Sequence, residues 1–223
     1  MSDAHPNDPV QADPVQADPV QADPVQADPV QMGPPASDPL ALAAEWLPAN
    51  DDPDRPQIAL ATNGIDGLPD VRTVLLSEFD GERFFFHTDA ASRKVAELDA
   101  DRRAAFSVLW PNFTRQLVVR GTVERAPETE LRSAYQRRSP YLKQLAWQNT
   151  AEFAALPFDE RVQRWAAEAE RFAGAEAEPP STWIGFALRP ERLLFWVSNP
   201  ATASRRIEYI RDGSGWLIEH RPG

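Results

Sequence analysis

The sequence predicts a mainly β fold with helices (α+β), built as an antiparallel β-barrel with a helical side layer. Three observations favour this class. Short apolar or alternating segments, separated by Gly, Asp and Asn turn signals, predict about seven or eight strands. Residues 127–173 have helical periodicity and interrupt the series of strands. An antiparallel barrel with helices beside it is the economical way to bury the apolar faces of so many short strands.

A five-residue repeat precedes the folded part. Its copies read DPVQA from Asp8, Asp13, Asp18 and Asp23, and DPVQM from Asp28. A proline in every unit blocks helix and ladder, and one valine per unit cannot offset the entropy of ordering. We therefore interpret residues 1–37 as a disordered, extended tail and residues 38–223 as the folded domain. A docking or spacer arm is the alternative to a solvated repeat that grew by slippage.

The elements of the domain follow in order. Asp38 and Pro39 predict the N-cap and first turn of a helix, and Ser92 predicts the N-cap of a second short helix. The helical region opens at 127–128 and includes an amphipathic helix over 159–172. Strands are expected at 57–62, 71–76, 83–87, 104–110, 116–124, 182–188 and 192–198, and in a last segment that turns from 207–211 through 212–215 into 216–219.

Two strand details can be predicted from the pattern. Strands 71–76 and 83–87 are expected to pair across Asp80-Gly81, which is a hairpin signal. In strand 116–124 one face carries the following residues: Leu117, Val119, Gly121 and Val123.

Composition excludes several classes of function. The chain has 223 residues and a formal net charge of -11, of which seven Asp lie in the first 39 residues with no Lys or Arg. The remaining 27 acidic and 23 basic residues do not predict a nucleic-acid binder. No apolar run reaches the ~18 residues of a membrane span, and the acidic start does not resemble a secretory signal. We expect a cytoplasmic protein with no nucleic-acid or membrane partner.

Other chemistries have little support. The absence of cysteine excludes disulfides, thiolate metal sites and Cys nucleophiles. His5, His87 and His220 do not have metal-ligand spacing, so no metal is expected. Walker, Rossmann and G-x-S-x-G patterns are absent.

One group of residues suits an anionic cofactor such as a flavin phosphate. Arg72 opens the strand RTVLL, and Ser92, Arg93 and Lys94 follow the strand FFFHT at the start of a helix. Cations beside a helix N-terminus favour a phosphate. A solvated basic turn with an ordinary N-cap is the structural alternative.

A second group suits an isoalloxazine ring. Trp196, in LLFWVS, is a candidate flat wall, and Gln116 is a candidate partner for the polar edge of the ring. The alternative is that Trp196 belongs to the barrel core and Gln116 faces water.

Taken together and in this order, the motifs resemble the pyridoxamine 5'-phosphate oxidase family, an FMN-binding split barrel, from about Leu40 to the C-terminus. The pieces are RTVLL (72–76), FHT (86–88), SRK (92–94), RQ (115–116), W-x-G-F (183–186), FW (195–196) and Arg206.

The resemblance implies a homodimer with FMN at the subunit interface and a small-molecule substrate. Arg72, Arg93 and Lys94 would hold the FMN phosphate. The other implied FMN-binding residues are Thr73, Val74, Leu75, His87, Thr88, Gln116, Trp196 and Arg206. A hydride would pass from the substrate to FMN, and oxygen would then give hydrogen peroxide. No side chain would act as a catalytic nucleophile, because the flavin carries the chemistry.

Departures from the family pattern concern the substrate. Ser77 replaces a lysine, and Thr202 and Ser204 replace an arginine and a histidine. In the helical region Tyr135 matches, Arg138 matches after a one-residue gap, and Lys143 replaces a serine; His87 replaces a tyrosine of the flavin site. The substrate-binding candidates are Ser77, Tyr135, Arg138, Lys143, Thr202 and Ser204. The sequence thus predicts a pyridoxamine or pyridoxine 5'-phosphate oxidase, with an FMN oxidase of another reduced heterocycle, as in phenazine biosynthesis, or a non-catalytic flavin-binding module as alternatives. A deazaflavin-dependent reductase fits the RTVLL and SRK motifs less well.

Overall fold

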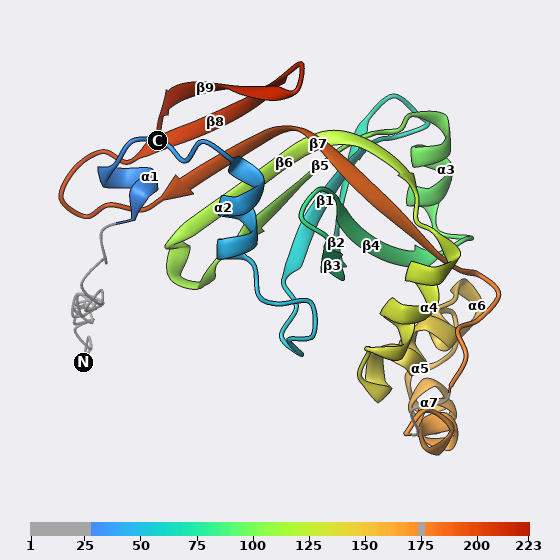
Figure 1. Ribbon diagram of the computed structural model, residues 1–223. Helices are drawn as coiled ribbons and strands as arrows, with labels where there is room; N and C mark the ends of the chain where they lie inside the picture. Colours follow the sequence, from blue (N-terminus) through green and yellow to red (C-terminus); the bar gives the residue numbers. More distant parts are fainter. Residues whose placement is uncertain (1–27, 174–176) are drawn as a thin grey trace, which may run out of the picture.

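The computed structural model describes residues 28–173 and 177–223. A curled, antiparallel nine-stranded sheet forms the body of this part, with helices at one end and on one face (Figure 1). The sheet order is β2-β1-β5-β6-β7-β4-β3, with β8 paired to β7 and β9 to β8. The predicted class, an antiparallel split barrel with a helical side layer, is confirmed.

The strands are β1 (Gln57–Asn63), β2 (Pro69–Leu75), β3 (Glu78–Phe79), β4 (Phe84–Asp89), β5 (Arg103–Leu109), β6 (Arg115–Arg125), β7 (Trp183–Val197), β8 (Arg205–Asp212) and β9 (Gly215–Pro222). The helices are α1 (Pro29–Met32), α2 (Pro39–Trp46), α3 (Arg93–Ala100), the 3-10 turn η1 (Pro111–Phe113), α4 (Glu128–Gln136), α5 (Pro140–Gln148), α6 (Ala151–Ala154) and α7 (Phe158–Phe172).

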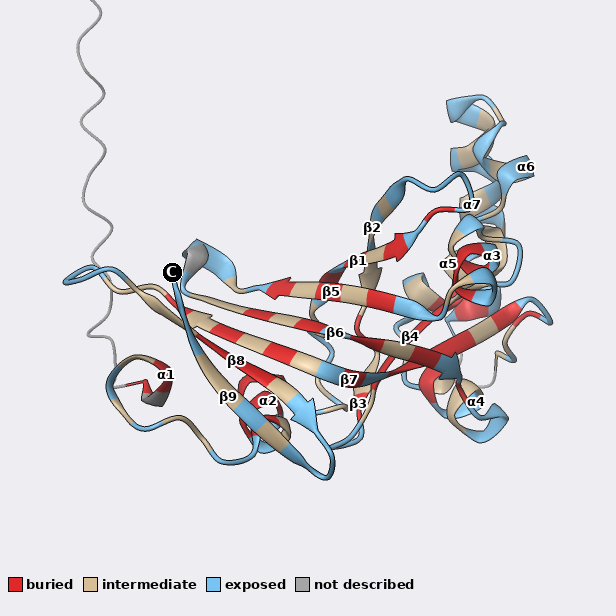
Figure 2. Ribbon diagram, turned by 90° about the horizontal axis from the view of Figure 1, so that it is seen from above, coloured by how far each residue is buried: buried red, intermediate tan, exposed pale blue. Residues whose placement is uncertain are grey.

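Alternating burial along the central strands defines the core. Along β5 and β6 every second residue is buried, as Figure 2 shows. The predicted inward face of β6 is confirmed, because Leu117, Val119, Gly121 and Val123 are all buried. Helix α2 closes this core, with Trp46 packed edge-on against Phe195 at 5.0 Å between ring centroids. The predicted N-cap of α2 is also confirmed, since Asp38 accepts a hydrogen bond from the Leu40 amide at 2.9 Å.

The predicted hairpin between 71–76 and 83–87 is wrong. β2 pairs with β1, and the partner of β4 across Asp80-Gly81 is the two-residue strand β3. A tight turn explains the change: Gly64 donates to Leu68 O at 2.9 Å and Gly67 has a φ of 82°. This turn folds β2 directly back onto β1, which leaves only β3 to complete the later hairpin.

The strands predicted at 182–188 and 192–198 are one continuous strand, β7. Its register against β6 shifts between Arg120 and Gly121, so Glu191 is the extra residue of a bulge. At Gly121 a Cβ would lie 2.0 Å from Arg189 O, so only glycine allows the backbones to approach this closely. The bulge lets the strand continue through Pro190, between the two strands that were expected to be separate.

The end of the predicted disordered tail, residues 28–37, is ordered in part. The last repeat copy forms α1, and Val30 is 1% exposed within the main core. Residues 1–27, which hold the other copies, lie outside the described residues, and the rest of the predicted tail stays a prediction.

Within the described residues, none of the helices has the length and apolar character needed to span a bilayer. The same residues contain no group of three or more His, Asp or Glu side chains arranged as a metal site.

Candidate functional site

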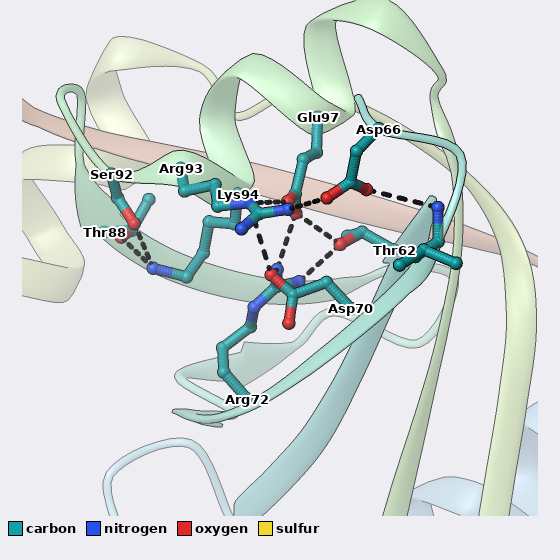
Figure 3. Close-up of polar contacts among 10 residues, drawn as sticks. Thr62, Asp66, Asp70, Arg72, Thr88, Ser92, Arg93, Lys94 and Glu97 are labelled. Atoms are coloured by element: carbon teal, nitrogen blue, oxygen red, sulfur yellow. Dashed lines mark hydrogen bonds and ion pairs between the residues drawn. The ribbon is translucent and has the colours of Figure 1, made fainter. Parts of the chain in front are cut away.

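The predicted phosphate residues come together where β2, β4 and the first turn of α3 meet (Figure 3). Arg72 extends from β2 and lies 2.6 Å from Glu97 and 2.8 Å from Asp70. Arg93 opens α3 and lies 2.8 Å from Glu97 and 3.0 Å from Asp66. We call Arg72, Arg93 and Lys94 the cation cluster.

Glu97 organises this cluster and was not identified from the sequence. Its side chain is fully buried on α3, one turn after Arg93. Burial alone would raise its pKa, but hydrogen bonds from Thr62, Arg72 and Arg93 outweigh burial and lower it. The i, i+4 spacing of Arg93 and Glu97 was the available signal for their contact. The contact between Glu97 and Arg72 depends on tertiary structure.

Lys94 differs from the two arginines in its partners. Its ammonium group donates to Thr88 Oγ1 at 3.0 Å and to the hydroxyl of Ser92. No carboxylate lies at ion-pair distance from Lys94 in the described part of the chain. Burial, and then the charge of Arg72, lower the pKa of Lys94. An anion placed here would relieve both effects, which makes Lys94 the cation best prepared to receive a phosphate.

The neighbours of Arg72 on β2 face in different directions. The side chain of Thr73 is exposed on the opposite face, whereas Val74 is half-buried against the core. Leu75 lines a cavity described below.

The predicted ring residues form a row across three adjacent strands. Gln116 on β6 is opposite Trp196 on β7, and Trp196 is opposite Arg206 on β8. Trp196 is half-buried and lies between the core residues Phe195 and Val197 in sequence, so it faces away from the core. The alternative that Trp196 is barrel core is therefore wrong. We call Gln116, Trp196 and Arg206 the ring row.

Two side chains of the ring row have hydrogen-bond partners, whereas one nitrogen of the third, Arg206, has none among the described residues. The Trp196 indole donates to Ser204 Oγ at 2.8 Å, and Gln116 Nε2 donates to Ser107 Oγ at 3.1 Å. Arg206 Nε is buried and has no hydrogen-bond partner among the described residues. A buried donor without a partner is costly, and a bound polar ligand would satisfy it. Thr202, in the loop before β8, is exposed.

The cation cluster and the ring row lie at opposite ends of β7. Thr88, which contacts Lys94, is opposite Ile184, and the ring row contains Trp196. Twelve residues at ~3.3 Å each separate these positions by about 40 Å along the strand. Figure 1 shows α3 and α1 at the corresponding ends of the sheet. Within one chain the Lys94 end of the cluster and the ring row therefore lie near different ends of β7.

A third set joins two departures from the family pattern. His87 Nδ1 lies 2.9 Å from Ser77 Oγ, and His87 Nε2 lies 2.8 Å from Glu130 Oε2. His87 is buried and stacks on Trp183 at 5.1 Å between ring centroids. Opposite it, a Cβ on Gly185 would lie 2.7 Å from His87 Cδ2, so this glycine makes room for the imidazole. The structure thus places His87 beside Ser77 rather than in the cation cluster with Thr88.

The protonation of this set follows from its surroundings. Burial lowers the pKa of His87, although Glu130 opposes this effect. A neutral imidazole that faces a carboxylate through Nε2 carries its proton there, so Nδ1 accepts a hydrogen bond from the Ser77 hydroxyl. The remaining hydrogen-bonding capacity of Ser77 Oγ is then that of an acceptor.

A cavity of about 200 Å³ lies beside Ser77, between the α4–α5 region and the loop before β1. Its cationic side chains are Arg55, Arg137 and Arg138, and we call it the arginine cavity. Burial lowers the pKa of Arg138 to about 10, and its guanidinium lies 4.3 Å from the ring centroid of Trp183. Arg138 Nε and one terminal nitrogen of Arg55 are buried without hydrogen-bond partners among the described residues. These donors suit an anionic ligand.

The other helical candidates have structural contacts. Tyr135 is fully buried, donates to Lys143 O at 3.2 Å and accepts from the Trp147 indole at 3.1 Å. Lys143 is also buried, and neither residue is among those that line the arginine cavity. The sequence missed Arg55 and Arg137, because the tertiary fold alone brings the loop before β1 next to α4.

A larger cavity of about 330 Å³ lies over β1, β5, β6 and β7. It shares only Thr62 with the residues around the cation cluster, and Arg103, Arg120 and Arg192 line it. Its lining includes neither Ser77 nor any residue of the ring row, so we do not assign it to the same site.

Comparison with known sequences gives consistent matches. The sequence model of the pyridoxamine 5'-phosphate oxidase family matches residues 52–172. A pyridoxine/pyridoxamine 5'-phosphate oxidase of Cereibacter sphaeroides is 36% identical over 190 residues, which cover 82% of this chain and 93% of the relative. A protein of the same name from Rubrobacter xylanophilus is 38% identical over 160 residues, covering 71% and 73%.

Solved structures show the same fold. PhzG from Burkholderia lata 383, in complex with tetrahydrophenazine-1-carboxylic acid, has a TM-score of 0.69 at 24% identity and covers 85% of this chain and 94% of its own. A pyridoxamine 5'-phosphate oxidase-related, FMN-binding protein from Nostoc punctiforme has a TM-score of 0.58 at 18% identity, covering 74% and 86%. At these identities the likeness establishes the fold alone.

Proposed function

Because the chain belongs to the pyridoxamine 5'-phosphate oxidase family, we propose that it is an FMN-dependent oxidase of pyridoxamine or pyridoxine 5'-phosphate. The observation that carries the proposal is the cation cluster at the β4–α3 junction, where Lys94 contacts two hydroxyl groups and, among the described residues, no carboxylate at ion-pair distance. This arrangement is chemically suited to the phosphate of FMN.

The residues present fit FMN at both ends of the ligand. Arg72, Arg93 and Lys94 would hold the phosphate. At the ring, Trp196 would provide a flat wall, and the unpartnered Nε of Arg206 would donate to the polar edge. FMN, when bound, would supply the redox chemistry, taking a hydride from the substrate and passing the electrons to oxygen as hydrogen peroxide.

A homodimer is part of the proposal. Thr88 and Lys94 lie near one end of β7 and the ring row lies near the other, which is consistent with one FMN that uses the cation cluster of one subunit and the ring row of the other. A two-fold symmetric dimer supplies two such shared sites, since each subunit contributes both surfaces. This separation supports the interface location that the family resemblance implied.

The substrate would bind in the arginine cavity. Arg138, with its unpartnered Nε, would donate to an anionic group of the substrate, and Arg55 and Arg137 add positive charge. Ser77 would accept a hydrogen bond from the substrate, because its own hydroxyl proton is donated in the hydrogen bond to His87 Nδ1. Thr202 and Ser204 would approach from the partner subunit, beside the ring row.

An FMN oxidase of a different reduced heterocycle is the second candidate. The observation that favours it is Ser77, whose hydroxyl is bound to His87 at the place where the family resemblance expects a lysine. A phosphate dianion bound without that lysine would lose about 1.5–3 kcal/mol of charge-assisted hydrogen bonding. A substrate with a smaller negative charge would lose less binding free energy at this position.

Visible absorption of the purified protein, followed by anaerobic mixing with pyridoxamine 5'-phosphate, tests the proposal. A flavin band that bleaches on mixing and returns in air, with formation of pyridoxal 5'-phosphate, is the expected result. A flavin band that does not bleach would show that pyridoxamine 5'-phosphate is not a substrate. It would favour the second candidate or a non-catalytic flavin-binding module. Failure to take up added FMN would contradict the proposal as a whole.

The two oxidase candidates differ in their response to substitution. If the substrate is another heterocycle, the triple variant Ser77→Lys, Thr202→Arg and Ser204→His should create or sharply raise turnover of pyridoxamine 5'-phosphate. Unchanged turnover in a variant that still binds FMN would count against the second candidate.

A further inference from the structure

The last copy of the repeat is docked on the sheet through the side chains that define the repeat. Asp28 lies 3.0 Å from Arg115, and its side chain is 3% exposed. Val30 is 1% exposed and belongs to the main core. Gln31 donates to Val197 O. The aspartate, the valine and the glutamine of the unit each make a specific contact.

The sheet side of this contact is built from four residues. Arg115 begins β6, Val197 ends β7, Asn199 follows β7 and Arg205 begins β8. Arg205 donates to the backbone carbonyl of Gly33 at 2.6 Å, a contact that does not depend on the side chain at that position. We call these four residues the docking surface. Figure 1 shows α1 at this end of the sheet, beside β8.

All five copies of the repeat carry the same residues at the positions whose side chains make these contacts in the docked copy. They differ only at the fifth position, which is Met32 in the docked copy and alanine at 12, 17, 22 and 27. Met32 is 73% exposed and therefore adds little to docking. Each earlier copy carries the same aspartate for Arg115, the same valine for the core and the same glutamine for Val197.

We propose that the docking surface recognises the Asp-Pro-Val-Gln unit, and that the copies beginning at Asp8, Asp13, Asp18 and Asp23 can replace the copy at Asp28. The connection to α2 presents no obstacle to replacement by the nearest copy. A shift of one unit lengthens the link between the docked unit and Asp38 by five residues, and doubling a flexible loop costs only about threefold in the equilibrium constant. The repeat is then a set of interchangeable docking motifs.

Three full-length variants test the exchange by thermal unfolding. Val30→Asp removes the docked valine, a fivefold variant changes Val10, Val15, Val20, Val25 and Val30 to Asp, and a fourfold control spares Val30. We expect the fivefold variant to lower the Tm by about 3–6 °C. Val30→Asp should lower it by less than a third of that shift, because a neighbouring copy takes its place, and the fourfold control should match the wild type.

Two outcomes would overturn the proposal. If Val30→Asp lowers the Tm as much as the fivefold variant does, the earlier copies do not replace the docked one. If the fivefold variant has the same Tm as the wild type, docking of the unit does not stabilise the protein.

Binding in trans provides a second measurement. A fluorescent peptide DPVQADPVQ should bind the fivefold variant saturably, by fluorescence anisotropy, and at least tenfold more weakly after Arg115→Glu is added. The same peptide with both valines changed to Asp is the control and should not bind. Equal binding of the two peptides, or no binding of either, would contradict recognition of the unit.

Discussion

Lys94 holds its charge between two hydroxyl groups, Thr88 and Ser92, whereas Arg72 and Arg93 already contact carboxylates. A phosphate would therefore gain most from Lys94. Ion pairs that pre-exist in the cluster position the arginines but also reduce the charge they offer to a ligand. The cluster thus consists of two arginines in ion pairs and one lysine that contacts only hydroxyl groups among the described residues.

The first prediction concerns this lysine. Lys94→Met should weaken FMN binding by about 10- to 100-fold, the equivalent of one charge-assisted hydrogen bond of ~1.5–3 kcal/mol. Titration of the apoprotein with FMN, followed by flavin fluorescence quenching, measures the effect. Arg132→Met is the matched control, because Arg132 is an exposed cation on α4 that pairs with Glu178 at 2.8 Å. Equal affinity in the two variants would remove Lys94 from the phosphate site.

The second prediction concerns His87 and pH. Because burial lowers the pKa of His87 in the folded state, the unfolded chain binds a proton near pH ~6.5, before the folded chain does. The free energy of unfolding should therefore fall as pH drops below ~6.5 toward the folded pKa, by at most about 1.4 kcal/mol per pH unit from this group.

Denaturant unfolding between pH 5 and 8, roughly the range in which histidine titrates, measures this slope. His87→Gln should flatten the pH dependence, and His220→Gln, which changes an exposed residue of β9, should leave it as in the wild type. A wild-type slope in His87→Gln would show that His87 is not held neutral.

The sequence predicted which residues share a site more successfully for residues that are neighbours in the chain than for residues that only folding brings together. Ser92, Arg93 and Lys94 form one string, and their contacts are local. Glu97 was missed because its contact with Arg72 joins α3 to β2, which are distant in sequence. Arg55 and Arg137 were missed because only the tertiary fold brings the loop before β1 next to α4. His87 and Thr88 are neighbours in the sequence, but successive residues of a strand face opposite sides, so His87 contacts Ser77 while Thr88 contacts Lys94.

Among the elements, β7 is the one that gives the site its dimensions. Its fifteen residues run from the cation-cluster end of the sheet to the ring row. The bulge opposite Gly121 allows this length, since it absorbs Glu191 without ending the strand. The sequence predicted two separate strands, at 182–188 and 192–198, and no local pattern reveals that Gly121 on the neighbouring strand accommodates the irregularity between them.

The third prediction tests this bulge. Gly121→Ala places a Cβ 2.0 Å from a backbone oxygen, Arg189 O, which a side-chain rotation cannot relieve. The cost should be at least about 1–3 kcal/mol, as for overpacking in a tight core. Gly215→Ala is the control, since its nearest neighbour would be 3.7 Å away. Denaturant unfolding compares the two, and similar stabilities would show that β6 and β7 can separate here at no cost.

On the scale of the whole molecule, alternation and turn signals were sufficient to predict the fold class. They were insufficient for strand pairing, as the partner of β4 shows, because Asp80-Gly81 identifies a turn and not the strands it joins. Along β7, the residues next to Lys94 and the ring row lie near different ends of the strand. The proposed dimer resolves this separation by pairing the cluster of one subunit with the row of the other.

Complementation between two defective subunits tests the shared FMN site most directly. Lys94→Met damages the cation cluster and Arg206→Met damages the ring row, so each variant alone should bind FMN weakly. Co-expression at equal levels should produce heterodimers in which one of the two sites contains neither substitution. About a quarter of all sites in the mixture should then bind FMN with wild-type affinity, given random pairing in a two-fold dimer. A mixture that binds FMN only as weakly as its two components would contradict a site shared between subunits.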